Sequence, residues 1–227
     1  RQRLRGRPIQ CITGSAGFRE LPLAVHDGVL IPRPETEVVT GEALALIRGL
    51  GAPRVLDLGC GTGAIGLSIA FEHPTARVVA VDLAAAAVAN TRANAEALGL
   101  CERVQVVAGD LFAPLTAAGV EPAFDLIVSN PPYVRHGDIA ALQPEVRDWE
   151  PHLALDGGVD GLAAYRRLIP QSEAWLGPAG HLVLELGDGL SAAVAELVAA
   201  APWLTPVAVR PDLGGVPRVL VAGRRGC

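Results

Sequence analysis

The segment Arg54–Gly66, RVLDLGCGTGAIG, constrains the fold most, because an apolar run, a glycine loop and a helical pattern follow one another directly. Residues 54–58 have the composition of a buried strand, and the helical pattern Leu67-Ser-Ile-Ala follows Gly66. Glycines in such a loop allow a tight turn and let a ligand approach the backbone, and the helix start offers free N–H groups. Gly61, Gly63 and Gly66 also match the dinucleotide-binding pattern G-x-G-x-x-G, which is a weak signal by itself.

Strand-like and helix-like patterns alternate over most of the chain. Besides residues 54–58, short apolar runs predict strands at 77–81, 104–107, 124–128, 181–186, 204–209 and 218–221. Helical patterns lie between them at 84–98, 161–176 and 189–200. Such alternation is typical of a parallel sheet with helices on both faces. We therefore predict an α/β fold with a Rossmann-like, doubly wound, mostly parallel seven-stranded sheet.

The first 50 residues have a different organisation. Residues 18–31 alternate loosely around Asp27-Gly28, a strong turn signal, and predict a small N-terminal β-hairpin. Pro34 followed by Glu35 and Glu37 is a good helix start. We thus predict an N-terminal linker, β-hairpin and leading helix over residues 1–50, and a main domain over residues 51–227.

The composition argues against several functional classes. The 227 residues fit one large domain or a domain with a small appendage. The formal net charge of −5 disfavours a long phosphate-tracking surface, so no direct nucleic acid partner is expected. There is no uncharged apolar run long enough to span a bilayer and no signal-peptide pattern, so no membrane association is expected. The four cysteines are far apart in sequence, which indicates reduced thiols in a cytoplasmic protein; they are Cys11, Cys60, Cys101 and Cys227. The five histidines are equally scattered, so no metal site is expected.

The sequence Asn130-Pro131-Pro132-Tyr133 directly follows the predicted strand 124–128. The prolines end the ladder because they have no N–H, which leaves the carbonyls of Asn130 and Pro131 free at the carboxyl end of a central strand, where open α/β sheets bind ligands. An Asn oxygen beside a fixed carbonyl makes two acceptors for an –NH2 group, and Tyr133 offers a flat face for a planar group. The alternative is an ordinary Pro-Pro turn with an Asn cap.

Acidic residues end other predicted strands. Asp82 follows the second strand and is placed to accept both hydroxyls of a ribose, although it would also serve as a cap for the helix that follows. Asp110 follows the third strand, where it would accept from an adenine amino group while Leu111 or Phe112 packs on the ring. The alternative for Asp110 is an ordinary loop carboxylate.

Two cofactors fit this arrangement, a nicotinamide dinucleotide and S-adenosylmethionine. Asp57 lies two residues before Gly59, and an anion there would repel a pyrophosphate but suit an ammonium and a sulfonium. The third-strand acid and the Asn-Pro-Pro-Tyr corner have no obvious task in hydride transfer. These residues favour S-adenosylmethionine.

Together, Leu-Asp-Leu-Gly-Cys-Gly-Thr-Gly, Val-Asp82, Gly-Asp110 and Asn-Pro-Pro-Tyr resemble the class I S-adenosylmethionine-dependent methyltransferases. The chain resembles the HemK/PrmC family more closely, the N5-glutamine methyltransferases of peptide chain release factors. That likeness extends over nearly the whole chain and includes Ile12-Thr13-Gly14, residues 31–37 (IPRPETE), residues 150–155 (EPHLAL), Asp212-Leu-Gly-Gly and Arg218-Val-Leu.

The resemblance implies a role for each matching residue. Gly59, Cys60, Gly61, Thr62 and Gly63 would wrap the methionine part of the cofactor, with Asp57 behind them, and Asp82 would hold the ribose. Asp110, Leu111 and Phe112 would form the adenine site, although the family often has a Trp where Leu111 stands. Asn130 and the Pro131 carbonyl would hold the glutamine amide, with Pro132 and Tyr133 completing the catalytic corner, and residues 33–37 would help to close the site.

The resemblance also implies the reaction: the enzyme would transfer a methyl group to a glutamine of the release-factor Gly-Gly-Gln motif. Residues 51–227 would form its methyltransferase domain. Family members carry a small helical domain ahead of that domain, which this sequence lacks, so we expect weaker substrate docking. Four alternatives stay open: glutamine methylation of a ribosomal protein, adenine-N6 methylation of nucleic acid, an NAD-dependent oxidoreductase, and a non-catalytic cofactor-binding module.

Overall fold

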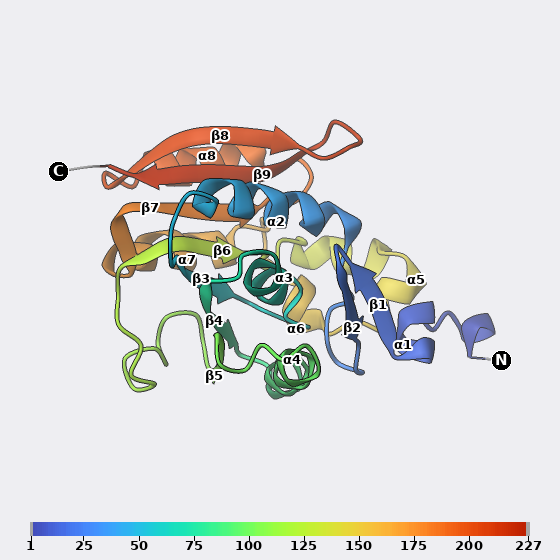
Figure 1. Cartoon of the computed structure of the whole chain (residues 1–227). Helices are drawn as coiled ribbons and strands as arrows, with labels where there is room; N and C mark the ends of the chain where they lie inside the picture. Colours follow the sequence, from blue (N-terminus) through green and yellow to red (C-terminus); the bar gives the residue numbers. More distant parts are fainter. Residues whose placement is uncertain (1, 226–227) are drawn as a thin grey trace.

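A computed structural model describes residues 2–225 and contains a seven-stranded sheet in the order β5-β4-β3-β6-β7-β9-β8 (Figure 1). Strands β5, β4, β3, β6 and β7 are parallel, whereas β9 is antiparallel to both β7 and β8. The predicted α/β fold with a mostly parallel seven-stranded sheet is confirmed. The strands are β3 (Arg54–Leu58), β4 (Arg77–Asp82), β5 (Val104–Ala108), β6 (Phe124–Ser129), β7 (Leu176–Glu185), β8 (Leu204–Pro211) and β9 (Pro217–Arg224).

The winding reverses beside β3. From β3 the chain crosses to β4 and then β5 on one side, and later to β6 and β7 on the other. Loops at the carboxyl ends of β3 and β6 therefore leave in opposite directions and separate. A crevice at this position is where open α/β sheets bind ligands.

Helices cover both faces of the sheet, as doubly wound folds require. On the face seen in Figure 1 lie α2 (Pro34–Ile47), α3 (Ala64–Glu72) and α4 (Ala85–Ala97). Behind it lie α7 (Ala163–Gln171), which the 3-10 helix η3 (Ser172–Ala174) continues, and α8 (Ser191–Ala199). The short helices are η1 (Arg3–Arg5), α1 (Ile9–Thr13), η2 (His136–Ala141), α5 (Pro144–Arg147) and α6 (His152–Leu155). No helix in residues 2–225 is long and apolar enough to span a membrane.

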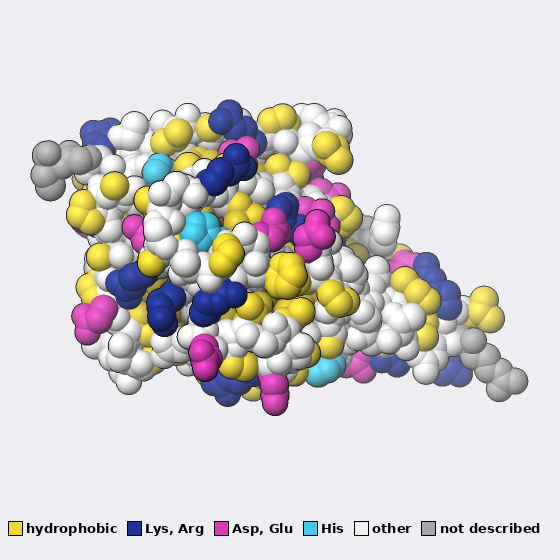
Figure 2. Space-filling view, viewed as in Figure 1, with side chains coloured by type: hydrophobic (Ala, Val, Ile, Leu, Met, Phe, Trp, Pro, Cys, Tyr) yellow, Lys and Arg dark blue, Asp and Glu magenta, His cyan; other side chains and the backbone are white. Residues whose placement is uncertain are grey.

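Neighbouring residues on the central strands alternate between two cores. Val55, Val128 and Val183 pack in the core under α2 and α3, whereas Leu56 and Ile127 pack in the core under α7 and α8. Because both faces are covered, these strands are apolar at almost every position. The outer surface is mixed: on the face shown in Figure 2, acidic, basic and apolar side chains are interspersed.

The N-terminal hairpin is present, but its predicted turn at Asp27-Gly28 is wrong. Strands β1 (Ser15–Phe18) and β2 (Leu21–Ala24) pair antiparallel around a turn at Arg19-Glu20. Burial sets this register, because Phe18, Leu21 and Leu23 enter the main core.

Side chains of α4 hold the chain that follows β2. The Ala24 N–H donates to Asn94 Oδ1 at 2.8 Å, and the His26 N–H donates to Asn90 Oδ1 at 3.0 Å. The segment expected to return as a second strand runs instead along α4, and Asp27 and Gly28 turn the chain towards α2.

The division at residue 50 stays a prediction. Helix α2 buries Val39, Ala43 and Ile47 in the same core as Val55 and Val183, so the leading helix shares its packing with the sheet.

Candidate active site

A cavity of about 290 Å³ opens at the carboxyl ends of β3, β4, β5 and β6. It brings together several of the residues predicted to bind cofactor or substrate: Gly59, Cys60, Gly61, Thr62, Asp82, Asp110, Leu111, Asn130 and Pro132. The segment between the hairpin and α2 also lines it, including Arg33 and Thr36. A larger hollow elsewhere is lined by Phe112, Trp175 and Arg224 and contains none of the other predicted site residues.

The glycine loop is held by backbone hydrogen bonds to the neighbouring strand. The N–H groups of Gly59 and Cys60 both donate to the Val81 carbonyl, at 2.8 and 3.1 Å. Gly61 has a φ of 57° and its N–H donates to Asp82 Oδ2 at 2.9 Å, so this loop requires the left-handed backbone that glycine adopts readily. A Cβ at Gly63 would lie 2.6 Å from Leu67 Cδ1, which shows that Gly63 serves close packing below the loop and does not line the cavity.

Asp57 lies beneath the loop and has no exposure to solvent. Its Oδ2 accepts a hydrogen bond from the Gly66 N–H at 2.9 Å, and its Oδ1 has no partner in residues 2–225. Burial raises the pKa of Asp57 to about 7. Asp57 therefore holds the start of α3 from beneath the loop, through Gly66, and does not line the cavity.

Asp82 accepts backbone hydrogen bonds on both sides of its strand end, and its expected bonds to ribose hydroxyls stay a prediction. Its Oδ1 accepts from the Ala84 N–H at 2.9 Å, at the residue preceding α4, while Oδ2 accepts from the loop at Gly61. Burial raises the pKa of Asp82, and the residue lines the cavity. Because each carboxylate oxygen has further lone pairs, Asp82 can cap the helix region and still accept from a ligand hydroxyl.

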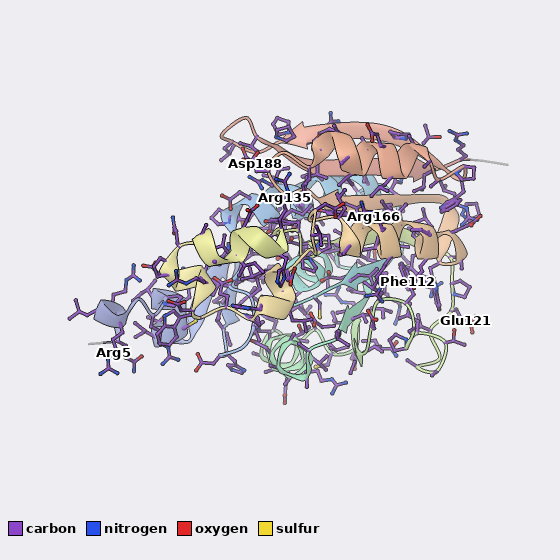
Figure 3. The ribbon with its side chains drawn as sticks, turned by 180° about the vertical axis from the view of Figure 1, so that it is seen from behind. Arg5, Phe112, Glu121, Arg135, Arg166 and Asp188 are labelled. Atoms are coloured by element: carbon purple, nitrogen blue, oxygen red, sulfur yellow. The ribbon has the colours of Figure 1, made fainter. Side chains whose placement is uncertain are left out.

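The segment after β5 separates Asp110 and Leu111 from Phe112. Asp110 and Leu111 line the cavity, and Asp110 Oδ2 accepts from Arg167 Nη2 at 2.6 Å. Leu111 has a φ of 48°, and the turn directs Phe112 into the core under α7, where it stacks on Trp175 with ring centroids 6.3 Å apart. Figure 3 views this side of the molecule with Phe112 labelled. Of the two candidates for packing on a ring, the structure therefore brings Leu111 to the cavity.

The Asn-Pro-Pro-Tyr corner lies at the end of β6, beside the glycine loop. A Cβ placed on Gly59 would lie 3.7 Å from the Asn130 carbonyl oxygen, so the two segments approach closely. Asn130 and Pro132 line the cavity, whereas Pro131 is buried and Tyr133 lies behind the corner. The Tyr133 hydroxyl donates to Glu185 Oε1 at 3.3 Å. The expected contact between the face of the Tyr133 ring and a substrate amide stays a prediction.

Comparison with known proteins identifies the family of this chain. A family model described as "Methyltransferase small domain" matches residues 42–159. The release factor glutamine methyltransferase of Bradyrhizobium diazoefficiens is 42% identical over 224 residues, which cover 97% of this chain and 74% of the relative. That of Geobacter sulfurreducens is 42% identical over 225 residues, covering 99% of this chain and 76% of the relative.

The chain belongs to the release factor glutamine methyltransferase family.

Solved structures agree with the fold. The T. thermophilus 16S rRNA methyltransferase RsmC, in complex with AdoMet and guanosine, has a TM-score of 0.63 at 24% identity, covering 93% of this chain and 50% of that one. The hMettl16 catalytic domain, in complex with a 3'UTR hairpin, has a TM-score of 0.68 at 17% identity, covering 88% of this chain and 74% of that one. The Rossmann-like methyltransferase fold expected from the sequence is thus confirmed.

The lining of the cavity in this methyltransferase fits S-adenosylmethionine. Gly59 has a φ of 75°, a left-handed backbone that glycine adopts readily, and it lies beside the Asn130 carbonyl on the cavity wall. The carboxylates of Asp82 and Asp110 line the space and can accept from the hydroxyl and amino groups of the cofactor, and Asp110 is also paired with Arg167, which lines the same space. Within residues 2–225 no group of three or more His, Cys, Asp or Glu side chains could hold a metal ion.

Sequence reasoning missed Glu185, the last residue of β7. Its side chain is buried and accepts from Thr36 Oγ1 at 2.6 Å and from the Tyr133 hydroxyl. The signal was available, because Glu185 is the one acidic residue in the apolar run 181–186, HLVLEL, predicted to be a buried strand. A carboxylate at such a position needs hydrogen-bond partners, and those partners belong to the site.

Sequence reasoning also missed the close packing of glycines around Tyr133. A Cβ at Gly157 would lie 2.7 Å from Tyr133 Cα, and one at Gly161 would lie 2.6 Å from the Tyr133 carbonyl oxygen. At Gly187 a Cβ would lie 2.8 Å from Cδ2 of the Tyr133 ring. The placement of Tyr133 thus depends on three glycines distant from it in sequence.

Proposed function

We propose that this enzyme transfers a methyl group from S-adenosylmethionine to the side-chain amide nitrogen of a glutamine in peptide chain release factors, within the Gly-Gly-Gln motif. The observation that carries the proposal is the position of Asn130 on the cavity wall beside the glycine loop, in a chain 42% identical to release factor glutamine methyltransferases. The net charge of −5 supports a protein substrate over a nucleic acid.

The residues of the chain divide the work of binding between them. The backbone of Gly59–Thr62 and the carboxylate of Asp82 would hold the cofactor, with Asp110 and Leu111 at its adenine. When bound, S-adenosylmethionine supplies an electrophilic methyl group on a sulfonium.

Asn130 and Pro131 act on the substrate amide. An amide nitrogen is a poor nucleophile because its lone pair is delocalised into the carbonyl. Two acceptors, Asn130 Oδ1 and the Pro131 carbonyl, would hold both N–H bonds, turn the lone pair towards the methyl group and stabilise the positive charge that develops on nitrogen. Fixing a reactant in this way supplies up to about 7–11 kcal/mol of the barrier in favourable cases.

The proton leaves without a strong general base at the corner. None of the side chains of Asn130, Pro131, Pro132 and Tyr133 is a good base, and Glu185 lies behind Thr36 and Tyr133 and does not line the cavity. Proton loss to solvent after transfer is consistent with this lining.

We place the reaction in the cytoplasm, and the free thiols of Cys11, Cys60 and Cys101 support a reducing compartment.

The experiment that tests the proposal uses the full chain, labelled S-adenosylmethionine and purified release factor, followed by peptide mass mapping. We expect one methyl group on the glutamine of Gly-Gly-Gln. Label in a ribosomal protein or in nucleic acid, with none in release factor, would reverse the assignment, and no transfer to any of them would indicate a binding module.

A further inference from the structure

A chain of hydrogen bonds runs from the amide corner into the interior. Asn130 Nδ2 donates to Thr36 Oγ1 at 3.2 Å, and Thr36 Oγ1 donates to Glu185 Oε2 at 2.6 Å. The Tyr133 hydroxyl donates to the other oxygen of the same carboxylate at 3.3 Å. One buried carboxylate is therefore connected to both ends of the Asn-Pro-Pro-Tyr corner.

The fold places these groups together. Ser129 pairs with Leu184 between the parallel strands β6 and β7, so Asn130 and Glu185 are the next residues at adjacent strand ends. Thr36, in the first turn of α2, packs over the same face. Thr36 and Glu185 are 3% and 1% exposed, and a carboxylate so deeply buried costs free energy that an apolar residue would not.

The directions of these hydrogen bonds follow from the chemistry of the groups. A hydroxyl has one proton, and a carboxylate only accepts, so the Thr36 proton goes to Glu185. The Thr36 oxygen is then left as an acceptor, and only the NH2 group of Asn130 can donate to it. The Asn130 oxygen is thus left for the cavity, and no group in residues 2–225 donates to it.

We infer that Thr36 and Glu185 are positioning residues that hold the Asn130 amide with its oxygen towards the substrate, so that the enzyme selects a carboxamide over a carboxylate. A glutamine NH2 can donate to this oxygen, whereas a glutamate carboxylate cannot and would be repelled. If the side-chain amide of Asn130 could rotate by half a turn, it would present its NH2 group to the substrate, and the site would then accept glutamate as readily as glutamine. The inference rests on the proposed function and specifies its substrate selection.

Charged and titratable groups surround Glu185 on every side. They are Glu35 on α2, Tyr133 after β6, Tyr165 on α7 and Arg218 on β9, of which Tyr165 donates to the Glu185 backbone carbonyl at 2.7 Å. Burial raises the pKa of Glu185 to about 7, while the Thr36 hydroxyl and the Arg218 charge oppose the rise. The selection is therefore tested at pH 8, where the carboxylate is ionised.

Thr36→Val is the decisive variant, because valine keeps the shape of threonine and removes the hydroxyl. Thr40→Val is its matched control: Thr40 lies one turn further along α2, is equally buried, and its hydroxyl bonds only the Thr36 carbonyl at 3.2 Å. Thr36→Ser restores a hydroxyl at the same place. Each protein is tested, with S-adenosylhomocysteine present, for affinity to release factor and to a release factor carrying Gln→Glu in Gly-Gly-Gln.

In the wild type, Thr40→Val and Thr36→Ser proteins, we expect the glutamine form to bind at least about tenfold more tightly than the glutamate form. In Thr36→Val we expect that ratio to fall below about threefold, with kcat roughly 10- to 100-fold lower. The affinity for S-adenosylhomocysteine should stay within about threefold of wild type in all three variants. A general loss of structure would not change this ratio selectively.

A folded Thr36→Val enzyme that keeps the full preference for glutamine would overturn the inference. Glu185→Leu provides a second test and should lose the preference as Thr36→Val does, whereas Glu185→Gln keeps an oxygen for Thr36 and should retain it. A wild-type enzyme that methylates release factor but binds both forms equally would contradict the inference alone. A wild-type enzyme that methylates no release factor would contradict the proposed function, and the inference with it.

Discussion

Arg33 and Glu150, 117 positions apart in sequence, form an ion pair with Arg33 Nη2 at 2.5 Å from Glu150 Oε1. The pair joins the segment before α2 to the loop before α6, and Arg33 lines the cavity. The Glu150 side chain is only 2% exposed, and its Oε2 has no partner in the described residues. Arg33 thus neutralises a buried carboxylate while forming part of the cavity wall.

Replacing Arg33 by Met should lower the free energy of unfolding by roughly 1–3 kcal/mol at pH 7, because it leaves the Glu150 carboxylate buried without a cation. Urea unfolding measures this loss. Arg166→Met is the control, since its pair with Asp160 is about half exposed to solvent, and its loss of stability should be much smaller than that of Arg33→Met. Equal losses in the two variants would argue against a special role for the Arg33–Glu150 pair.

Asn130→Ala should lower kcat/KM by about 30- to 1000-fold, corresponding to roughly 2–4 kcal/mol of lost transition-state stabilisation. The affinity for S-adenosylmethionine, measured by calorimetry, should change by less than about threefold, because the glycine loop and Asp82 are untouched. Wild-type turnover in a variant of unchanged cofactor affinity would refute the role assigned to Asn130.

Asp57 should make the stability of the cofactor-free protein fall as pH rises. Its pKa is raised from 3.8 to about 7 by burial, so the folded state binds this proton more tightly than the unfolded state. The resulting stabilisation is fully present below the unfolded pKa and is lost as pH rises towards 7. Glu185, whose pKa burial also raises to about 7, contributes a second loss over the same pH range. We expect Asp57→Asn to remove only the Asp57 share, on the order of 3 kcal/mol in urea unfolding between pH 4 and pH 8.

Asp160→Asn is the control for this pH dependence. The Arg166 guanidinium lowers the pKa of Asp160 to about 2, so its contribution is lost only as pH falls towards 2. The stability of this variant should follow that of wild type between pH 5 and pH 8. A decrease between pH 4 and pH 8 that is as large in Asp57→Asn as in wild type would show that Asp57 does not contribute, and would leave Glu185 as the group responsible.

Gly187→Ala should impair methyl transfer, because the added Cβ would lie 2.8 Å from the Tyr133 ring and displace it from Glu185. We expect kcat/KM to fall by roughly 10-fold or more, since an overpacked site shifts groups that must be placed accurately. In Gly51→Ala the new methyl group would meet nothing within 4 Å, so steady-state kinetics should be unchanged. If both variants were equally active, Tyr133 would not depend on this packing.

Local sequence predicted most of the fold because the strands are short apolar runs that end in glycine, aspartate or asparagine. The seven strands and the helices that alternate with them could be found in this way. The hairpin turn could not, because Asp27-Gly28 is a strong local signal and the competing hydrogen bonds come from Asn90 and Asn94 on α4. Long-range contacts decided the register there.

The site shows the same division between local and distant causes. Residues that lie directly after a strand, such as Asp82 and Asn130, reach the cavity as expected. Phe112 does not, because the backbone conformation of Leu111 sends it to the opposite core, and no pattern in the sequence signals a φ of 48° at a leucine. The contacts of Thr36 and Glu185, 149 positions apart, depend on how α2 packs on the sheet.

The reversal of winding beside β3 has a consequence for how this enzyme can change. The opening exists because two loops depart on opposite sides of the same pair of strands, and no side chain has to hold it apart. Substitutions along its walls can therefore alter which molecules enter, while the hollow itself persists for as long as the strand order is kept. New substrate preferences are accessible to such a chain without a new architecture.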